Sequence, residues 1–396
     1  MAYIKSFSVT GLAGRKGVVR RNLQRDTNIF WGFNGSGKTS LLKILHSALA
    51  NDASLLLRVP FRTASVTFHS KNHDVTFTRK INKEQLTELI TETFITSNDF
   101  RMRKHFMESP ALRWDTSIRG KGAEAIPDRI RENSFRHTYL PISRVNESRK
   151  QARSVTRTEV GTGSVDEEML DRLFAEQIKG IWQNYNTHSL MTIRNAQEKG
   201  LALVLSSVLG SRKGADEKLE GGEIESEQAY DMVRKFFAEQ RLRRYLKLGS
   251  HASFVKNYES DPLLRSVVSE ISEVQKEIEI ALEPQLRIQQ LISEMYGGDK
   301  QLTFRHGDLE ITSGGEQIPI ESLSGGEKQL LRILLECLAT EDSPILIDEP
   351  ELSMHVDWQH RLIESMRVIN PSMQILMATH SPEIMADIPD DRVFPL

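Results

Sequence analysis

The spacing of apolar residues changes twice along the chain, and each change marks a different kind of secondary structure. In the first hundred residues, apolar and polar positions alternate over 3–12, a short apolar run covers 27–32, and alternation returns over 64–81 around a polar turn. Such patterns are typical of strands, and the last one predicts a hairpin. Residues 40–50 instead carry apolar side chains at helical spacing. We therefore expect strands arranged around one helix.

The middle of the chain has helical periodicity. The segments 164–185, 225–248 and 261–296 repeat apolar residues every three or four positions. One apolar stripe in the third segment, with charge on its opposite face, consists of Leu264, Val267, Val268, Ile271, Val274, Ile278 and Leu282. This stripe suits packing against another helix, in this chain or in a second copy. Pro284 is expected to kink or divide the helix.

Strand patterning returns near residue 300 and is followed by strands that alternate with helices. Residues 300–322 read as strands, and the apolar runs "PILIDEP" and "QILMATHSP" flank a helical pattern at 357–369. An alternation of strands and helices implies a largely parallel core sheet, with its ligand site at the carboxyl ends of the strands. The predicted fold class is α/β, interrupted by a mainly helical insertion.

These patterns predict three parts of the chain. Residues 1–144 form an N-terminal lobe, residues 145–300 form the helical insertion, and residues 301–396 form a C-terminal lobe.

Composition narrows the class of protein. The 396 residues are 39% hydrophobic and 27% charged, which is ordinary for a globular protein. No apolar run approaches the ~20 residues of a membrane helix, and the N-terminus lacks a secretory h-region, so we expect a cytoplasmic protein without membrane association. The single cysteine, Cys337, excludes an internal disulfide or a multi-cysteine metal site and is expected to fill the core.

Charge is distributed unevenly. Residues 101–157 carry 14 Lys/Arg against 6 Asp/Glu, whereas the last 96 residues carry 6 against 17. The basic stretch could neutralise nucleic-acid phosphates or an acidic protein, and a solvated arginine-rich face accounts for it equally well. Nucleic acid therefore stays open as a partner.

The segment Gly32–Thr39, "GFNGSGKT", fits the phosphate-loop pattern between a predicted strand and a predicted helix. Its glycines let backbone N–H groups turn inward around phosphates, where the helix N-terminus adds partial positive charge. We expect Lys38 to reach the β- and γ-phosphates of ATP and Thr39 to bind Mg²⁺. The predicted nucleotide-binding residues are Asn34, Gly35, Ser36, Gly37, Lys38, Thr39 and Ser40.

Two further strand ends carry side chains suited to ATP hydrolysis. Asp348 and Glu349 end an apolar strand, where Asp348 would support Mg²⁺ through water and Glu349 would act as general base on the attacking water. His380 ends the next strand and would bond the γ-phosphate or that water. Taken alone, Asp348 and Glu349 could simply form an acidic turn after a strand, and His380 could have a structural role.

The tetrad Ser-Gly-Gly-Glu occurs twice. The first, Ser313–Glu316, lies between strand patterns and predicts a hairpin turn. The second, Ser324–Glu327, opens an apolar helix, so it presents free backbone N–H groups and a serine hydroxyl to a phosphate. The predicted phosphate-binding residues here are Ser324, Gly325, Gly326 and Glu327.

The order of these motifs resembles the ABC-type ATPase head, and the segments "IDEPELSMHVDWQ" and "ILMATHSP" are similar to SMC-like and OLD-like ATPases. The resemblance covers about 1–100 and 300–390. It implies a mixed sheet with helices and two copies that sandwich two ATP molecules. In such a dimer, Ser324 and its glycines would complete the site whose lysine belongs to the other copy, and Glu351 to His355 would contact the opposite head.

Two departures from those relatives shape the functional hypothesis. The insertion is too short for a long coiled-coil arm, and since only 16 residues follow His380 in this sequence, we expect no TOPRIM nuclease domain. The chain therefore resembles the ATPase subunits of PARIS-type or Septu-type anti-phage systems, which implies a separately encoded nuclease or toxin as partner. The alternatives are a DNA-binding repair ATPase that uses 101–157, and a nucleotide-gated scaffold with little turnover.

Overall fold

The computed structural model describes residues 2–88, 112–121, 123–141, 167–209, 224–239, 250–297, 300–305 and 307–396. The chain divides into two compact units. The first contains Met1–Trp182 and Arg287–Leu396, and the second contains Gln183–Leu286. The second unit therefore lies inside the predicted insertion, and the described residues 167–182 and 287–297 at the ends of that insertion belong to the first unit.

One five-stranded sheet of the first unit is antiparallel, in the order β2-β1-β4-β5-β6. Its strands are β1 (Ala2–Thr10), β2 (Val18–Asn22), β4 (Thr63–Ser70), β5 (Val75–Asn82) and β6 (Asp115–Arg119). The predicted hairpin is confirmed, since β4 and β5 pair over their whole length from Thr63↔Asn82 to Ser70↔Val75. The inward residues of β1 and β4 alternate with half-buried ones, as expected for a sheet with one face on the core.

The second five-stranded sheet is parallel throughout, in the order β13-β3-β12-β11-β7. Its strands are β3 (Thr27–Trp31), β7 (Thr138–Leu140), β11 (Pro344–Asp348), β12 (Gln374–Thr379) and β13 (Val393–Pro395). Every residue of β11 and β12 is buried, as in parallel sheets covered on both faces. The predicted parallel core sheet is confirmed, and with it the mixed α/β fold class.

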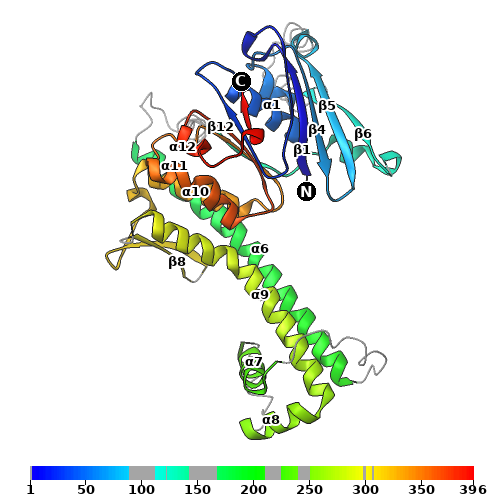
Figure 1. The fold of residues 1–396 in the computed structure, drawn as a ribbon, viewed down its shortest axis with the longest axis vertical. Coiled ribbons are helices and arrows are strands. Elements are labelled where there is room, and N and C mark those ends of the chain that lie inside the picture. The colour runs from blue at the N-terminus through cyan, green and yellow to red at the C-terminus, as the bar shows by residue number, and fades with distance from the viewer. Residues whose placement is uncertain are drawn as a thin grey trace, which may run out of the picture. The chain divides into compact units, whose positions relative to one another are not determined.

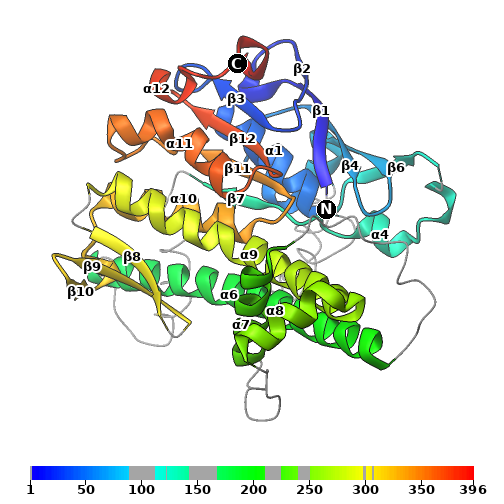
Figure 2. The same ribbon diagram turned by 60° about the horizontal axis from the view of Figure 1, so that its bottom comes forward.

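Helix α1 (Lys38–Ala50) lies between the two sheets (Figure 1). Its apolar side chains, Leu41, Leu42, Ile44, Leu45, Ala48 and Leu49, are fully buried in one core with both sheets. Helices α10 (Gly325–Ala339) and α11 (Val356–Ile369) pack against each other on the other side of the parallel sheet (Figure 2). Cys337 of α10 is buried and unpaired, which confirms its predicted place in the core.

A three-stranded antiparallel sheet consists of β8 (Lys300–Arg305), β9 (Asp308–Ser313) and β10 (Glu316–Ile318). The turn between β9 and β10 contains Gly314 and Gly315, both with positive φ. Glycine adopts this conformation without the steric cost that a Cβ would bring. The first Ser-Gly-Gly-Glu tetrad is thus the hairpin turn that the sequence predicts. Short helices α4 (Asp128–Glu132) and α12 (Pro382–Met385) complete the first unit.

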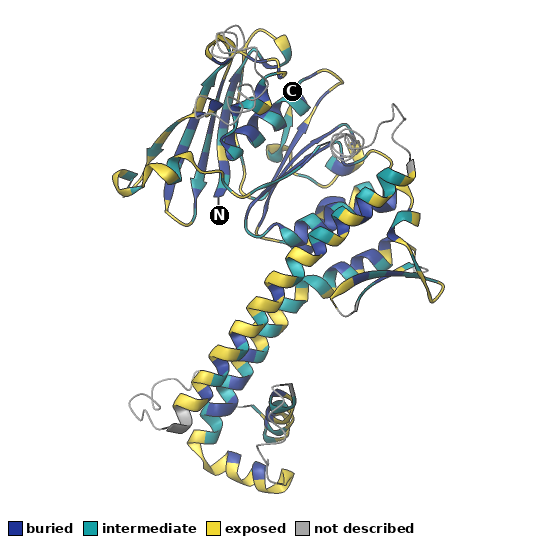
Figure 3. Cartoon of the chain, turned by 180° about the vertical axis from the view of Figure 1, so that it is seen from behind, coloured by how far each residue is buried: buried dark blue, intermediate teal, exposed yellow. Residues whose placement is uncertain are grey.

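The second unit is helical. It contains α7 (Ser226–Glu239), α8 (His251–Ser260) and the inner parts of α6 (Glu167–Leu209) and α9 (Pro262–Met295). Val268 and Ile271 of the predicted stripe are fully buried in a core with residues of α6, α7 and α8. The stripe therefore packs within this chain, and the helices are buried along one side and exposed along the other (Figure 3). Among the described residues, no helix has the length and apolarity to cross a membrane.

Pro284 was expected to kink or divide its helix, and helix α9 excludes the division. Pro284 lies inside it, and the helix continues from Pro262 to Met295 without division. A proline removes one helical hydrogen bond, and here the packing of the remaining residues outweighs that loss.

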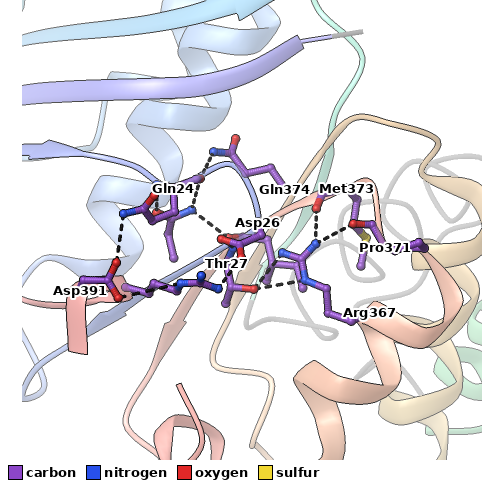
Figure 4. A network of polar contacts seen from close by, with 11 residues as sticks. Gln24, Asp26, Thr27, Arg367, Pro371, Met373, Gln374 and Asp391 are labelled. Atoms are coloured by element: carbon purple, nitrogen blue, oxygen red, sulfur yellow. Dashed lines mark hydrogen bonds and ion pairs between the residues drawn. The ribbon is translucent and has the colours of Figure 1, made fainter. Parts of the chain in front are cut away.

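The amino-terminal edge of the parallel sheet is joined by a polar network (Figure 4). The buried Gln374 side chain donates to the carbonyls of Ile4 and Gln24 and accepts from the N–H of Ile4. The Arg367 guanidinium donates to Thr27 Oγ1 and to two carbonyls of the loop that leads into β12. This network ties the parallel sheet to β1 and to α11.

Candidate nucleotide site

The loop that follows β3 is shaped by glycines. Gly35 and Gly37 have φ values of 81° and 102°, and a Cβ on Gly37 would lie 2.9 Å from Cγ of Leu12. Gly37 is the N-cap of α1, and no side chain caps this helix. The first N–H groups of α1, including those of Lys38, Thr39 and Ser40, lack acceptors within the helix. The loop therefore presents backbone donors to an anion at a helix N-terminus.

Lys38 is the buried cation of this site, with 4% of its surface exposed. Its Nζ donates to the Gly32 carbonyl at 2.8 Å and to His380 Nε2 at 2.7 Å. Burial lowers the pKa of Lys38, and the carboxylates of Glu349, Asp348 and Glu351 oppose that shift. The ammonium is held by neutral acceptors, which an anionic phosphate oxygen would outcompete because charge-assisted hydrogen bonds are stronger.

Asp348 and Thr39 meet across the sheet edge. Thr39 Oγ1 donates to Asp348 Oδ1 at 3.2 Å, although 309 residues separate them. Burial raises the pKa of Asp348 to about 6, against the bond from Thr39. The sequence predicted both as magnesium-supporting residues, and the fold brings them together.

Glu349 and His380 face each other at the ends of β11 and β12. His380 Nε2 lies 3.2 Å from Glu349 Oε1. The Lys38 ammonium can only donate, so Nε2 accepts from it in the neutral ring, and a bond to Glu349 requires a proton on Nε2. Glu349 has a φ of 48°, a left-handed conformation unusual outside glycine. The predicted base and the predicted histidine are therefore in one constellation with Lys38.

The residues present fit ATP with Mg²⁺. Ser36 Oγ and Asp348 Oδ2 are buried without a hydrogen-bond partner in the described part of the chain. Buried polar atoms are nearly always bonded, so these two are available to a ligand. Magnesium favours oxygen ligands and keeps phosphates and waters in its shell, so it needs few protein ligands. Thr39 and Asp348 would hold the metal, and Lys38 with the loop amides would hold the phosphates.

Ser324 and Glu327 form a capping box at the start of α10. Ser324 Oγ accepts from the Glu327 N–H, and Glu327 Oε2 accepts from the Ser324 N–H at 2.7 Å. Burial alone would raise the pKa of Glu327, but hydrogen bonds from Lys300 and Ser324 outweigh it and lower this pKa. The Glu327 carboxylate thus supports the helix start together with the backbone and side chain of Ser324. The phosphate contact of this segment stays a prediction.

The turn after β11 supplies residues that the sequence analysis did not assign to this site. Glu351, expected from the resemblance to face an opposite head, directs Oε1 to the N–H of His380 at 2.6 Å. The third acidic residue in "DEPE" was the available signal, but its partner lies 29 residues away on another strand. Residues 101–111, 122 and 142–157 of the basic stretch lie outside the described residues, so its proposed contact with nucleic acid stays a prediction.

Comparison with known proteins agrees with this chemistry. A family model described as "AAA ATPase domain" matches residues 4–385. A "Retron Vc95 probable ATPase" of Vibrio cholerae is 26% identical over 101 residues, which is 22% of this chain and 20% of that protein. A "DNA double-strand break repair Rad50 ATPase" of Saccharolobus solfataricus is 36% identical over 88 residues, 20% of this chain and 10% of that protein. The matches thus span a fifth or less of either relative's length.

Two solved structures align with nearly the whole chain, with low sequence identity and TM-scores below 0.5. One is an Smc head domain with an extended coiled coil from Pyrococcus furiosus, bound to the C-terminal domain of ScpA. It has 15% identity and a TM-score of 0.43, and the match covers 98% of this chain and 92% of that one. The other is an SmcHead bound to the C-winged helix domain of ScpA, with 11% identity, a TM-score of 0.45, and coverage of 97% and 92%.

Proposed function

Because the chain belongs to the AAA ATPase domain family, we propose that it binds ATP with Mg²⁺ at the loop before α1 and hydrolyses it between two copies of itself. The observation that carries this proposal is the convergence of Lys38, Asp348, Glu349 and His380 at one sheet edge. These residues come from three separate segments of sequence. They supply a cation for phosphate, a carboxylate for Mg²⁺, a carboxylate that can act as base, and an imidazole that can hydrogen-bond the water or the phosphate. Mg²⁺, when bound, would neutralise charge that develops on the phosphates.

In this proposal, some residues of the site bind the nucleotide and the metal, and others act on the attacking water. Lys38 and the uncapped start of α1 would bind the phosphates, and Thr39 and Asp348 would hold Mg²⁺. Glu349 accepts a proton from the attacking water. His380 is placed to orient that water or the terminal phosphate once Lys38 turns from the ring to the nucleotide.

In this proposal, Ser324 of a second copy closes the site. The start of α10 carries a serine hydroxyl and two glycines at a helix N-terminus, which suits a terminal phosphate. ATP binding would then assemble two copies, and hydrolysis would release them. The assembly would regulate a separately encoded effector in anti-phage defence, a role that the retron ATPase among its relatives supports.

The test uses Glu349→Gln, which removes the base and keeps the shape of the side chain. We expect turnover to fall about 100-fold or more, with ATP bound and a dimer retained, as measured by phosphate release and sedimentation. In the same background, Ser324→Asp keeps a good N-cap but places negative charge at the nucleotide, and should abolish the dimer. Ser313→Asp, in the tetrad that forms a hairpin turn, is the matched control and should leave the dimer intact. Wild-type turnover by Glu349→Gln would refute the assigned base.

A DNA-repair ATPase is the second candidate, favoured by the match to a Rad50 ATPase. The two candidates differ in whether duplex DNA binds the nucleotide-loaded protein with an affinity that falls steeply as salt rises. A scaffold with little turnover would instead assemble with ATP and release phosphate at the rate of the Glu349→Gln variant.

A further inference from the structure

Glu351 joins the two loops that carry the reacting side chains. Its Oε1 accepts the backbone N–H of His380 at 2.6 Å, and its Oε2 is buried without a hydrogen-bond partner in the part of the chain that the structure describes. The next residue, Leu352, is 46% exposed. The turn after β11 therefore has an inward side fixed on the histidine loop and an outward side open at the surface.

A second side chain makes the same connection from α11. Gln359 donates from Nε2 to the Met354 carbonyl at 2.9 Å, and its Oε1 accepts from Ser381 Oγ at 2.7 Å. Ser381 in turn caps the short helix α12. Glu351 and Gln359, here called the clamp, thus bind the 351–354 turn to the 380–381 loop at two separate points.

The turn is also held from the side of α10. Ser353 has a φ of 65°, and a Cβ on Gly326 would lie only 2.4 Å from the Ser353 carbonyl oxygen. A non-glycine residue keeps a left-handed backbone only where its surroundings fix it. The turn, the start of α10 and the histidine loop are therefore packed closely enough that a displacement of one must be accommodated by the others.

We propose that Glu351 is a positioning residue that makes the His380 loop and the 351–354 turn move as one body. The inference rests on the proposed function, because it names how the nucleotide would be sensed. When Lys38 turns to a phosphate, the imidazole loses its 2.7 Å contact with Nζ, and the clamp passes the resulting shift to Leu352 and to Ser353 beside Gly326. The nucleotide site thereby controls the surface that meets the second copy.

The carboxylate suits this position for two reasons. A charged acceptor makes a stronger bond to a backbone N–H than a neutral one does. Its negative charge also acts on Lys38, opposing the effect of burial on the pKa of that ammonium. The Glu351 carboxylate is thus bonded to the His380 loop, while the Glu351 backbone belongs to the surface turn.

The experiment compares Glu351→Ala and Glu351→Gln with Glu364→Ala, an exposed glutamate on α11. We expect Glu351→Ala to bind a fluorescent ATP analogue within about threefold of wild type, whereas ATP-dependent dimerisation and kcat fall at least tenfold. Glu351→Gln keeps an oxygen for the His380 N–H and should recover most of both. A purely structural residue would instead lower affinity, assembly and thermal stability together, and that pattern would overturn the proposal.

Hydrogen exchange separates this inference from the proposed function. In Glu351→Ala, peptides that cover 350–356 and 378–384 should lose protection together, with no nucleotide added, whereas Glu364→Ala should change neither. Loss of protection in only one of the two peptides would refute the clamp even if the protein dimerises. If wild type fails to dimerise with ATP, the proposed function fails, and the paired exchange result still decides whether the two loops are joined.

Discussion

Particular buried side chains at the two edges of the parallel sheet differ in how completely they are hydrogen-bonded. At the amino-terminal edge, the polar atoms of the Gln374 side chain all have partners, and Arg367 reaches both Thr27 and loop carbonyls (Figure 4). At the carboxyl-terminal edge, Ser36 Oγ and Asp348 Oδ2 are buried without partners in the described chain. The Gln374 side chain at the start of β12 is therefore fully hydrogen-bonded, whereas Ser36 and Asp348 near the strand ends keep buried atoms without partners.

This difference suggests that Gln374 contributes to stability, whereas Ser36 and Asp348 serve ligand binding. A buried polar atom without a partner costs roughly 1–3 kcal/mol. The carboxyl-terminal edge carries such a cost where it has the chemistry for ATP, and the amino-terminal edge carries none at Gln374. We therefore expect substitutions at one edge to change ligand binding with little loss of stability, and substitutions at the other to do the reverse.

Lys38→Met should give the largest effect on binding. It keeps the buried stem of the side chain and removes the charge that would pair with phosphate, so ATP affinity should fall about 100-fold or more, equivalent to about 3 kcal/mol. The free energy of unfolding should change by less than about 1 kcal/mol, because burial already disfavours the ammonium. Calorimetric titration and urea unfolding measure the two quantities, with the exposed Lys80→Ala as control. Wild-type ATP affinity would remove Lys38 from the site.

Gln374→Leu should give the converse result at the other edge. The substitution removes the side-chain amide that bonds the N–H and carbonyl of Ile4 and the carbonyl of Gln24. Because these buried groups lose that partner, the free energy of unfolding should fall by about 3 kcal/mol. ATP affinity of the folded protein should stay within about twofold of wild type. Gln317→Leu, on the exposed strand β10, is the control. An affinity loss as large as that of Lys38→Met would show that the two edges are not independent.

The smallest expected effect comes from a third polar cluster, at the far part of α1. His46 Nδ1 lies 2.6 Å from His137 Nε2, and His137 Nδ1 donates to the Phe135 carbonyl. Burial, with His137, lowers the pKa of His46 to about 4 from 6.5, and burial, with Arg79 nearby, lowers the pKa of His137. The unfolded chain therefore binds more protons than the folded one between these values, and stability falls as the pH falls from 6.5 toward 4.

A pH series of urea unfolding measures this effect. Wild type should lose more stability than His46→Leu between pH 6.5 and 5, by about 1–2 kcal/mol, because the variant lacks one titrating group. Equal slopes for the two proteins would mean that His46 does not titrate in the folded state with a lowered pKa. Other titrating groups, such as the buried Asp348, contribute equally to the pH dependence of both proteins, so their contribution cancels when the variant is subtracted from wild type.

Local patterns predicted the elements well because their signals lie within a few residues. The hairpin of β4 and β5, helix α1 and the turn at Gly314 follow from alternation, helical spacing and glycine pairs. Whether the helix divides at Pro284 could not be predicted from the proline alone, because the packing on both sides of it also counts. The boundary of the second unit at Gln183 also could not be predicted from the sequence, because α6 continues across it with the same helical periodicity.

The site was predictable as a list of residues, but not as an arrangement. Lys38, Asp348 and His380 end recognisable strands or begin a helix, so their types and places were evident. The contact of Lys38 with His380 and the bond from Glu351 depend on strand order, which no local pattern encodes. Glu351 shows this most clearly, because the motif that contains it suggested an outward role and the fold turns its carboxylate inward.

The order of strands in the parallel sheet has a consequence for synthesis of the chain. Strand β3 pairs with β12 on one side and β13 on the other, both more than 340 residues later. The phosphate loop is therefore synthesised long before β12 and β13, the strands that anchor β3 in the parallel sheet. Such long-range closure slows folding and leaves apolar edges unpaired in the nascent protein. Nucleotide binding should thus begin only after β12 and β13 have been made and have paired with β3.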